Sequence, residues 1–206
     1  MNPRLHPPEA RLLGHVVGGA DPAAQGLMDC HLAQCDACAA RIADLSRTGG
    51  AFLAQGSPLA PPPDLFTRIL ARIEPEAPVP AFPFARVLAP YLPADSARGW
   101  RGALCPGFRF LELVADLPRG LGFYLVHMAP GRPFPEHRHH GLEEAVVLAG
   151  GFEDGGERME AGDWFSKPEG TGHAPRALDG EDCWLVVRTE ADIRFRGWRG
   201  VLQRLA

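Results

Sequence analysis

The sequence lacks a basic excess, and it lacks any long apolar run. Lys167 is the single lysine among the 21 basic residues, and the formal net charge is −4. Without a basic surface, direct binding to nucleic acid is not expected. No run approaches the roughly 18 apolar residues of a membrane span, and the first residues do not form the apolar segment of an export signal. We therefore expect a cytoplasmic protein that makes no contact with a membrane.

Cysteine is present in an odd number, five in 206 residues. Together with the lack of an export signal, this number predicts reduced thiols and argues against a disulfide framework. Two of the thiols, Cys35 and Cys38, follow His31 in the pattern H-x3-C-x2-C. Neutral imidazole and thiolate suit Zn²⁺, and structural zinc takes four protein ligands in a tetrahedron. The pattern predicts a zinc site, the alternative being two buried thiols beside a hydrogen-bonded histidine.

The fourth ligand of this site is open among three residues. His6 is the first candidate, although it would have to fold back across the pair of cysteines. His15 and Cys30 compete with it, but both fit better as packing residues. His31 and Cys35 are expected to share one helix face. The two cysteines fit the turn that opens the next helix, where the helix dipole favours the thiolate form. Metal binding and folding of this segment should therefore be coupled.

Three short helices are expected around this motif, at residues 8–19, 22–34 and 36–47. Asp21-Pro22 supplies an N-cap and a proline at the first helical position of the second helix, and Gly49-Gly50 is expected to end the third. A fourth helix should follow a proline-rich loop, with Asp64 as its N-cap. Its apolar stripe either packs on the first three helices or also meets a partner protein. The stripe consists of Leu65, Phe66, Ile69, Leu70 and Ile73.

Prolines at positions 75, 78, 80 and 83 predict a stiff, extended connector. They divide the chain into a helical domain at residues 1–75, a proline-rich linker at 76–88 and a β domain at 89–206. No core is predicted to be shared across the connector, so the two domains are expected to be independent. Beyond it the hydrophobic period becomes alternating, with short apolar strand runs separated by Gly, Pro and Asp turns, which is typical of an antiparallel sandwich or barrel.

The β domain carries two histidine motifs. The first, G-x5-H-x-H-x3-E-x6-G, contains His137, His139 and Glu143, and the second, G-x5-P-x-G-x2-H, ends at His173. Residues two apart in a strand face the same side, so His137 and His139 can both point inward, with Glu143 and His173 arriving from neighbouring strands. This pair of motifs resembles the cupin superfamily, which implies a jelly-roll β-barrel. Ala177 stands where that superfamily commonly has asparagine.

Alternatives remain within this domain. The histidines could form a solvated loop cluster, and Glu144 competes with Glu143 as the carboxylate ligand. Cys183, in an apolar strand, is expected to be a core thiol, and a redox role near the metal is the alternative.

The order of these features resembles the ChrR family of zinc-binding anti-sigma factors over nearly the full chain. The resemblance implies an α + β fold in separate domains, with a small all-α zinc-binding helical domain followed by an all-β cupin jelly-roll barrel. It implies one zinc held by His6, His31, Cys35 and Cys38, and a second, or Fe²⁺, Mn²⁺ or Ni²⁺, held by His137, His139, Glu143 and His173.

The resemblance also implies a function. The helical domain, including the fourth helix, would bind an extracytoplasmic-function sigma factor in a 1:1 complex, and the cupin would be needed for its release under singlet oxygen or a related oxidant. The closed four-ligand site fits a scaffold better than a catalyst. The alternative is a metal-dependent cupin enzyme, a dioxygenase or isomerase acting on a small molecule, since such enzymes use the same ligand types.

Overall fold

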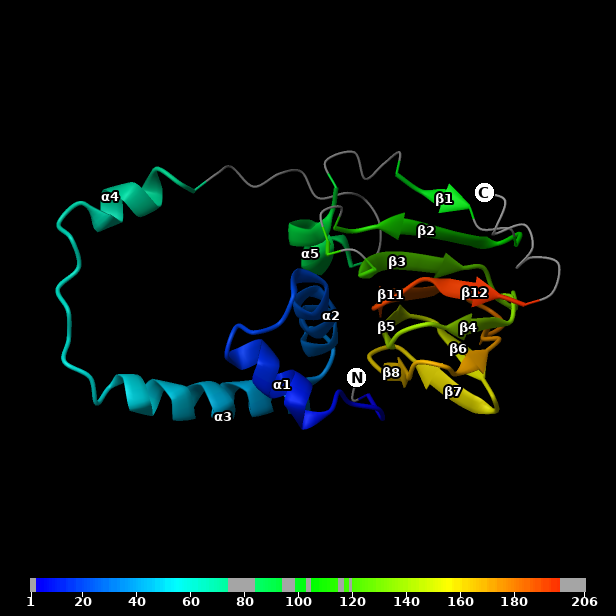
Figure 1. Ribbon diagram of the computed structural model, residues 1–206, viewed down its shortest axis with the longest axis horizontal. Coiled ribbons are helices and arrows are strands. Elements are labelled where there is room, and N and C mark those ends of the chain that lie inside the picture. Colours follow the sequence, from blue (N-terminus) through cyan, green and yellow to red (C-terminus); the bar gives the residue numbers. More distant parts are fainter. Residues whose placement is uncertain are drawn as a thin grey trace.

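Helices precede strands along the chain, as the change in hydrophobic period predicts (Figure 1). The computed structural model describes residues 3–73, 84–93, 99–102, 105–114, 117–118 and 120–196. The helices are α1 (Glu9–Val16), α2 (Pro22–Leu32), α3 (Asp36–Leu53), α4 (Leu65–Leu70), α5 (Ala85–Leu88) and the 3-10 turn η1 (Ala89–Tyr91). Within those ranges, none of the helices combines the length and the hydropathy that crossing a bilayer requires.

The strands form three antiparallel sheets. The large sheet has the order β1-β2-β3-β11-β5-β8, and the small sheets have the orders β10-β6-β7 and β12-β4-β9. The ladders that join the described strands do not close these sheets into one barrel. The strands are β1 (Arg101–Gly102), β2 (Phe108–Glu112), β3 (Gly122–Met128), β4 (His137–His139), β5 (Glu143–Ala149), β6 (Gly151–Asp154), β7 (Glu157–Glu160), β8 (Trp164–Lys167), β9 (Gly172–His173), β10 (Arg176–Ala177), β11 (Cys183–Thr189) and β12 (Ile193–Phe195).

The central strands β3, β5 and β11 are buried on both faces, which explains why they read as continuous apolar runs. Alternate residues of each strand belong to two different hydrophobic clusters. In β11, Val186 faces the helices, whereas Leu185 and Val187 face the small sheets. Each of these strands therefore contributes side chains to both hydrophobic clusters.

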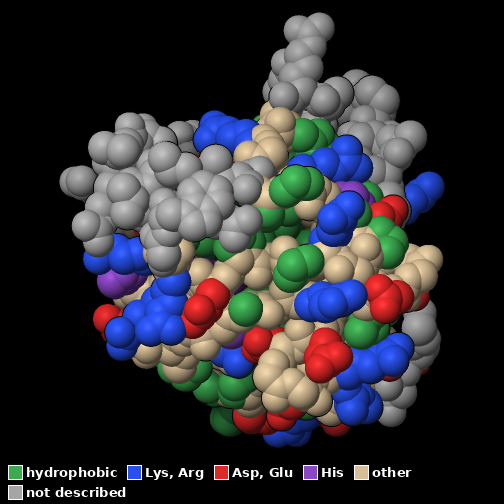
Figure 2. All heavy atoms as spheres, turned by 90° about the vertical axis from the view of Figure 1, so that its right-hand side faces the viewer, with side chains coloured by type: hydrophobic (Ala, Val, Ile, Leu, Met, Phe, Trp, Pro, Cys, Tyr) green, Lys and Arg blue, Asp and Glu red, His purple; other side chains and the backbone are tan. Residues whose placement is uncertain are grey.

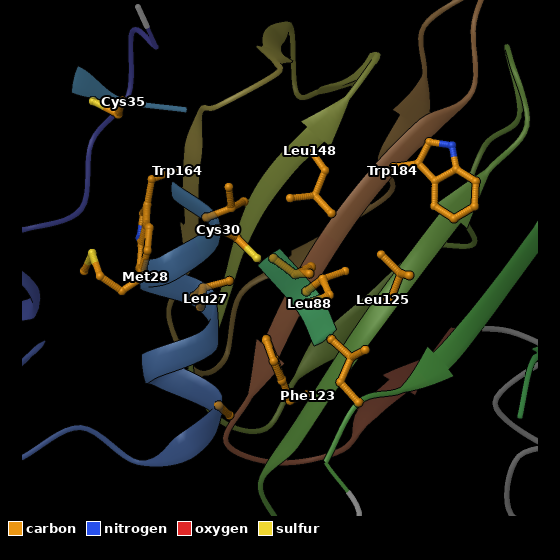
Figure 3. Close-up of a cluster of buried hydrophobic side chains, with 14 of the residues drawn as sticks. Leu27, Met28, Cys30, Cys35, Leu88, Phe123, Leu125, Leu148, Trp164 and Trp184 are labelled. Carbon is orange, nitrogen blue, oxygen red and sulfur yellow. The ribbon is translucent and has the colours of Figure 1, made fainter. Parts of the chain in front are cut away.

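The helices and the large sheet share a hydrophobic core, which the sequence did not predict. Leu27, Met28 and Cys30 of α2 pack with Phe123 and other side chains of the sheet in one cluster (Figure 3). Fully burying one such leucine or methionine stabilises a fold by about 1.5–3 kcal/mol. The expectation of independent domains fails because the outer face of the sheet is apolar and α2 covers it.

The segment before the sheet also departs from the expectation. Part of the expected linker forms α5, whose Leu88 is fully buried in the same shared core. The prolines at 75, 78, 80 and 83 lie outside the described residues.

The first two helices end earlier than the sequence predicts, α1 at Val16 and α2 at Leu32, while other helix ends agree or differ for identifiable reasons. The Asp21 carboxylate accepts a hydrogen bond from the Ala24 N–H at 2.9 Å, and Pro22 opens α2, so the predicted cap is confirmed. In contrast, α3 runs through Gly49-Gly50 to Leu53, because a helical glycine costs only about 1 kcal/mol. Asp64 precedes α4, but its side chain makes no capping hydrogen bond.

The interface between α2 and the sheet can be tested at Gly26. A Cβ at this position would lie 2.7 Å from the Phe123 ring, which is fully buried and has no room to move. We expect Gly26→Ala to lower the free energy of unfolding by about 1–3 kcal/mol through overpacking, despite the higher helix propensity of alanine. The measurement is thermal or urea unfolding of the full chain.

Gly14 in α1 is the matched control, since a Cβ there would meet nothing within 4 Å. Gly14→Ala should leave stability unchanged or raise it by up to about 1 kcal/mol. Equal stability of the two variants would contradict the packing of α2 described here.

Candidate metal centres

The first candidate centre lies where the segment before α1 meets the turn between α2 and α3. One ligand atom from each of His6, His31, Cys35 and Cys38 lies within 4.8 Å of the others. The His6 Nδ1 is 3.4 Å from the Cys35 Sγ and 3.5 Å from the Cys38 Sγ. Donor atoms around a tetrahedral zinc, with Zn–N of about 2.0 Å and Zn–S of about 2.3 Å, are separated by roughly these distances. The four donors therefore fit a zinc ion.

The two cysteines lie at the start of α3, as the sequence predicts. Cys35 is the N-cap, and its sulfur accepts a hydrogen bond from the Cys38 N–H at 3.4 Å. His31, however, is on α2, which ends at Leu32, so His31 and Cys35 do not share one helix. Burial and the neighbouring Cys35 sulfur raise the pKa of the Cys38 thiol to about 12, contrary to the effect expected of the helix dipole. A cation between the sulfurs would supply the charge that the thiolate form needs.

His31 is held in the orientation of a ligand by the β region. It is fully buried, its Nδ1 is 2.9 Å from the Gly162 carbonyl oxygen, and its Nε2 has no hydrogen-bond partner among the described residues. An Nδ1–H donated to a carbonyl leaves the Nε2 lone pair for a metal. Burial also lowers the pKa of His31, which favours the neutral form that ligates. The Trp164 ring packs edge-on against this imidazole, with centroids 5.9 Å apart.

The segment that carries His6 is held by the same turn of the β region. The Asp163 carboxylate accepts hydrogen bonds from the backbone N–H groups of Arg4 and Leu5 at 2.7 and 3.1 Å. The backbone N–H of Trp164 donates a hydrogen bond to the Leu5 carbonyl at 3.0 Å. Residues 162–164 therefore hold two of the four candidate ligands. The role of these three residues could not be predicted from the sequence, although Gly162 begins the second histidine motif.

The competing fourth ligands lie elsewhere. The His15 Nε2 is 3.9 Å from the Asp29 carboxylate, and Cys30 is fully buried in the shared core. Burial raises the pKa of the Cys30 thiol, so this sulfur stays protonated. The structure groups His6, and neither of these two residues, with the H-x3-C-x2-C motif.

The second candidate centre lies inside the β region. One donor atom from each of His137, His139, Glu143 and His173 lies within 4.8 Å of the others. His137 and His139 face the same side of β4, and His137 pairs with His173 across the β4–β9 ladder. Glu143 begins β5, and its oxygens lie 3.6 Å from the His139 Nδ1 and 3.7 Å from the His173 Nε2. The four sequence candidates thus come together at one buried point.

The hydrogen bonds of this cluster turn imidazole nitrogens toward its centre. The Nδ1 of His137 donates to the Pro135 carbonyl at 2.9 Å, and that of His173 donates to Asp154 at 3.0 Å. Their Nε2 atoms face each other at 2.9 Å. Both cannot be protonated at that distance, so at least one lone pair points into the cluster. A cation placed there would satisfy it.

Burial sets the charge state of the same groups. It lowers the pKa of His137 to about 3 and that of His139 to about 4, so both imidazoles are neutral near pH 7. Burial and the nearby Asp154 raise the pKa of Glu143 to about 7. The donor set of three neutral imidazoles and one carboxylate matches zinc and other divalent transition metals.

Asp154 binds the His173 nitrogen that points away from the centre, and no motif in the sequence marks this residue. Its carboxylate accepts from His173 and from the Lys167 ammonium, the latter at 2.8 Å. Although burial opposes it, these two partners hold the pKa of Asp154 below its usual value. A carboxylate behind a ligating histidine orients the ring and raises its basicity. The single lysine of the chain thus anchors this carboxylate.

Glu144 and Cys183 do not belong to the second centre. Glu144 is buried on the helical side of β5, where it forms an ion pair with Arg11 of α1 at 2.7 Å and contacts Arg188 at 3.4 Å. Burial raises the pKa of the Cys183 thiol to about 12, which suppresses the reactive thiolate. None of Cys30, Cys35, Cys38 and Cys183 is in a disulfide, as the sequence predicts.

Comparisons with known proteins point to one family. A family model described as the ChrR cupin-like domain matches residues 95–191. The chain is 31% identical to the anti-sigma-E factor ChrR of Cereibacter sphaeroides, over 96% of this chain and 95% of the relative. It is also similar to the anti-sigma ChrR in the crystal structure of its complex with Rhodobacter sphaeroides SigE, with a TM-score of 0.68, 30% identity and coverage of 90% of this chain and 98% of that chain. An RmlC-like cupin protein from Ralstonia eutropha aligns at 16% identity with a TM-score of 0.46, covering 55% of this chain and 82% of that chain.

Removing one sulfur tests the first centre. We expect protein purified without chelators to hold two metal ions per chain and the Cys38→Ala variant to lose one of them, with loosening of α2 and α3, because metal binding and folding are linked. Elemental analysis measures the ions, and circular dichroism follows the helices. Cys30→Ala is the matched control and should keep both ions. A Cys38→Ala variant with full metal content would refute this centre.

Asp154 offers a test of the second centre. Asp154→Ala should weaken metal binding there by about 10–100-fold, because His173 loses the partner that orients it. Competition with a chromophoric chelator measures the affinity. Glu157, exposed and paired with Asp154 across the β6–β7 ladder, is the control position. If Asp154→Ala binds metal as tightly as Glu157→Ala, Asp154 does not support the site.

Proposed function

The chain belongs to the ChrR family of anti-sigma factors, and from that premise we propose that it binds an extracytoplasmic-function sigma factor in a 1:1 complex and keeps it from RNA polymerase. The same likeness places it among regulatory proteins rather than enzymes. A cytoplasmic location follows from the partner.

The observation that best supports this proposal is the apolar surface of α4. All five residues of the predicted stripe are exposed, Phe66 of α4 by 71% and Ile73, three residues beyond the end of α4, by 66%. In Figure 1, α4 lies apart from the other helices. Phe52 and Leu53 at the end of α3 are exposed as well, by 71% and 83%. Monomeric proteins rarely leave such a group of large apolar side chains in water, so a protein partner is the natural cover.

The opposite end of the molecule has a different surface. Figure 2 shows basic and acidic side chains interspersed on that face, with apolar side chains between them. A mixed surface of this kind does not favour a highly charged partner such as nucleic acid. We therefore assign partner binding to the helical end.

We propose three functional units, with the boundaries that the sequence predicts. Residues 1–75 bind sigma and hold Zn²⁺ through His6, His31, Cys35 and Cys38. Residues 76–88 connect them to a cupin unit at 89–206, whose sheets form a jelly-roll barrel around the second metal. That ion is Zn²⁺, Fe²⁺, Mn²⁺ or Ni²⁺, because the ligand set His137, His139, Glu143 and His173 suits each of them.

We further propose that an oxidative signal, such as singlet oxygen, acts at the cupin and weakens the hold on sigma. Strand β8 offers a physical route between the two centres. Its Trp164 packs against His31, and the next residue, Phe165, stacks on His173 with ring centroids 5.6 Å apart. Adjacent residues of a strand point to opposite faces, so a shift of β8 reaches both centres at once. A signal can act this way only if it makes the shifted position of β8 more stable than the unshifted one.

Sigma binding can be tested at α4 without unfolding the protein. The double variant Phe66→Ala, Ile69→Ala should bind a cognate sigma factor at least about 30-fold more weakly, as expected when large apolar anchors of an interface are removed. Isothermal calorimetry or surface plasmon resonance measures the dissociation constant. Thr67→Ala in the same helix is the control. An unchanged dissociation constant for the double variant would remove α4 from the interface.

A further inference from the structure

We infer that a small neutral molecule with a hydroxyl group binds in a cavity between the first two helices and the edge of the large sheet. None of the described residues that line this cavity is a candidate metal ligand, so the site is distinct from both centres. Nothing in the proposed function requires it. An occupant would touch residues of the helical unit and of the cupin unit at once.

The cavity has a volume of about 90 Å³ and lies where α1, α2 and the turn between them meet β5 and β8. Its helical side is lined mainly by glycine and alanine, namely Ala10, Gly14, Gly19, Ala20 and Ala24. These small side chains leave the space open, and a Cβ at Gly14 would meet nothing within 4 Å. A single water needs roughly 10–15 Å³ of such space, so the cavity has room for several waters or one small organic molecule.

Two buried side-chain nitrogens at this cavity have no hydrogen-bond partner among the described residues. They are the Nε1 of Trp164 and the Nδ1 of His15. Trp164 is only 5% exposed, and Figure 3 shows its ring beside Met28, which lines the same cavity. Buried polar groups are nearly always paired, because leaving one unpaired costs its full desolvation. Two such atoms in one lining therefore point to an occupant with a polar group for both.

The two nitrogens make opposite demands on that occupant. An indole N–H can only donate, so the occupant must offer an acceptor to Trp164. The His15 Nε2 lies 3.9 Å from the Asp29 carboxylate, which favours the proton on that nitrogen and leaves a lone pair at Nδ1. The occupant must therefore also donate to His15. A hydroxyl group does both, whereas a carbonyl oxygen only accepts.

The charged residues of the lining favour a neutral occupant. Arg11 and Glu144 form an ion pair with two contacts, Nε to Oε1 at 2.9 Å and Nη2 to Oε2 at 2.7 Å. Each neutralises the other, so neither an anion nor a cation would find a free counter-ion among the lining residues. The alanines and Met28 suit the carbon atoms of the occupant. Small alcohols have this combination of groups.

The test uses the full-length, metal-containing protein and 2-propanol as the probe, followed through the indole N–H signals of ¹H–¹⁵N NMR spectra. The chain has four tryptophans, and Trp164→Phe identifies the signal of Trp164. We expect this signal to shift saturably with the concentration of 2-propanol. Acetone, which lacks the hydroxyl hydrogen, and acetate, which is charged, should bind at least tenfold more weakly.

Substitutions locate the binding. Gly14→Leu places a side chain in the cavity and should weaken 2-propanol binding at least tenfold. Gly49→Leu in α3 is the matched control and should bind as the wild type does, because a Cβ there also meets nothing within 4 Å but Gly49 lies outside the lining. His15→Phe removes the acceptor and should bind 2-propanol no more tightly than acetone.

A Trp164 signal that shifts linearly with 2-propanol, without saturation, would mean that the cavity holds water only and would overturn the inference. Equal affinity for acetone or acetate, or unaltered binding by a folded Gly14→Leu variant, would overturn it as well. Sigma binding is measured without 2-propanol, so its outcome bears on the proposed function alone.

Discussion

The rest of this structure depends on the hydrogen bonds between residues 162–164 and the amino-terminal segment. Three consecutive residues of the β region contact the backbone around His6 and the imidazole of His31. The backbone of Gly162 has φ of +89°, and a Cβ there would lie 2.6 Å from Pro3, so only glycine fits this close approach. The grouping of the four candidate ligands in the first centre is therefore not a property of the helical segment alone. It is assembled on the surface of the cupin.

Two further features reinforce this assembly. The shared core covers the outer face of the large sheet with α2 and α5. Beside it lies a charge network in which Arg188, itself buried, contacts Asp21 at 2.8 Å and Glu144 at 3.4 Å, while Glu144 also binds Arg11. Breaking a buried pair by removing one partner leaves an uncompensated charge, which typically costs 3–5 kcal/mol. These contacts hold α1 and α2 against the large sheet, whereas the side chains of α4 are exposed.

The division between a fixed metal centre and a free helix suits a regulated inhibitor. A partner that covers α4 does not need to disturb the shared core. A change at the cupin, by contrast, can reach the first centre through Trp164 and Phe165 within one strand. In the proposed function, the protein binds its partner through one surface and is controlled from another, and the signal must then favour one position of β8 over another.

The sequence predicted the parts of this architecture that depend on local spacing. Both groups of candidate ligands, the capping of α2 by Asp21 and the exposed apolar stripe around α4 all follow from residues close together in the chain or from recognisable motifs. It did not predict the contacts that depend on which surfaces meet. The residues around His31 in the sequence do not indicate that it contacts Gly162. The residues around His173 likewise do not indicate its contact with Asp154, or the contact of Asp154 with Lys167. The core shared by the helices and the sheet could not be predicted for the same reason. The sequence of an apolar strand that is buried on both faces does not indicate which element covers each face.

The rate of zinc loss from the cysteine-containing centre shows whether the cupin holds that centre together. Asp163→Ala removes the carboxylate that holds the backbone of Arg4 and Leu5 next to His6, while Glu160→Ala changes an exposed residue of the neighbouring β7 strand. In the full chain, with release followed by a chromophoric chelator, Asp163→Ala should lose this zinc about tenfold faster than Glu160→Ala and keep the ion of the histidine cluster. Equal rates of zinc loss would contradict the claim that the cupin holds the first metal centre together.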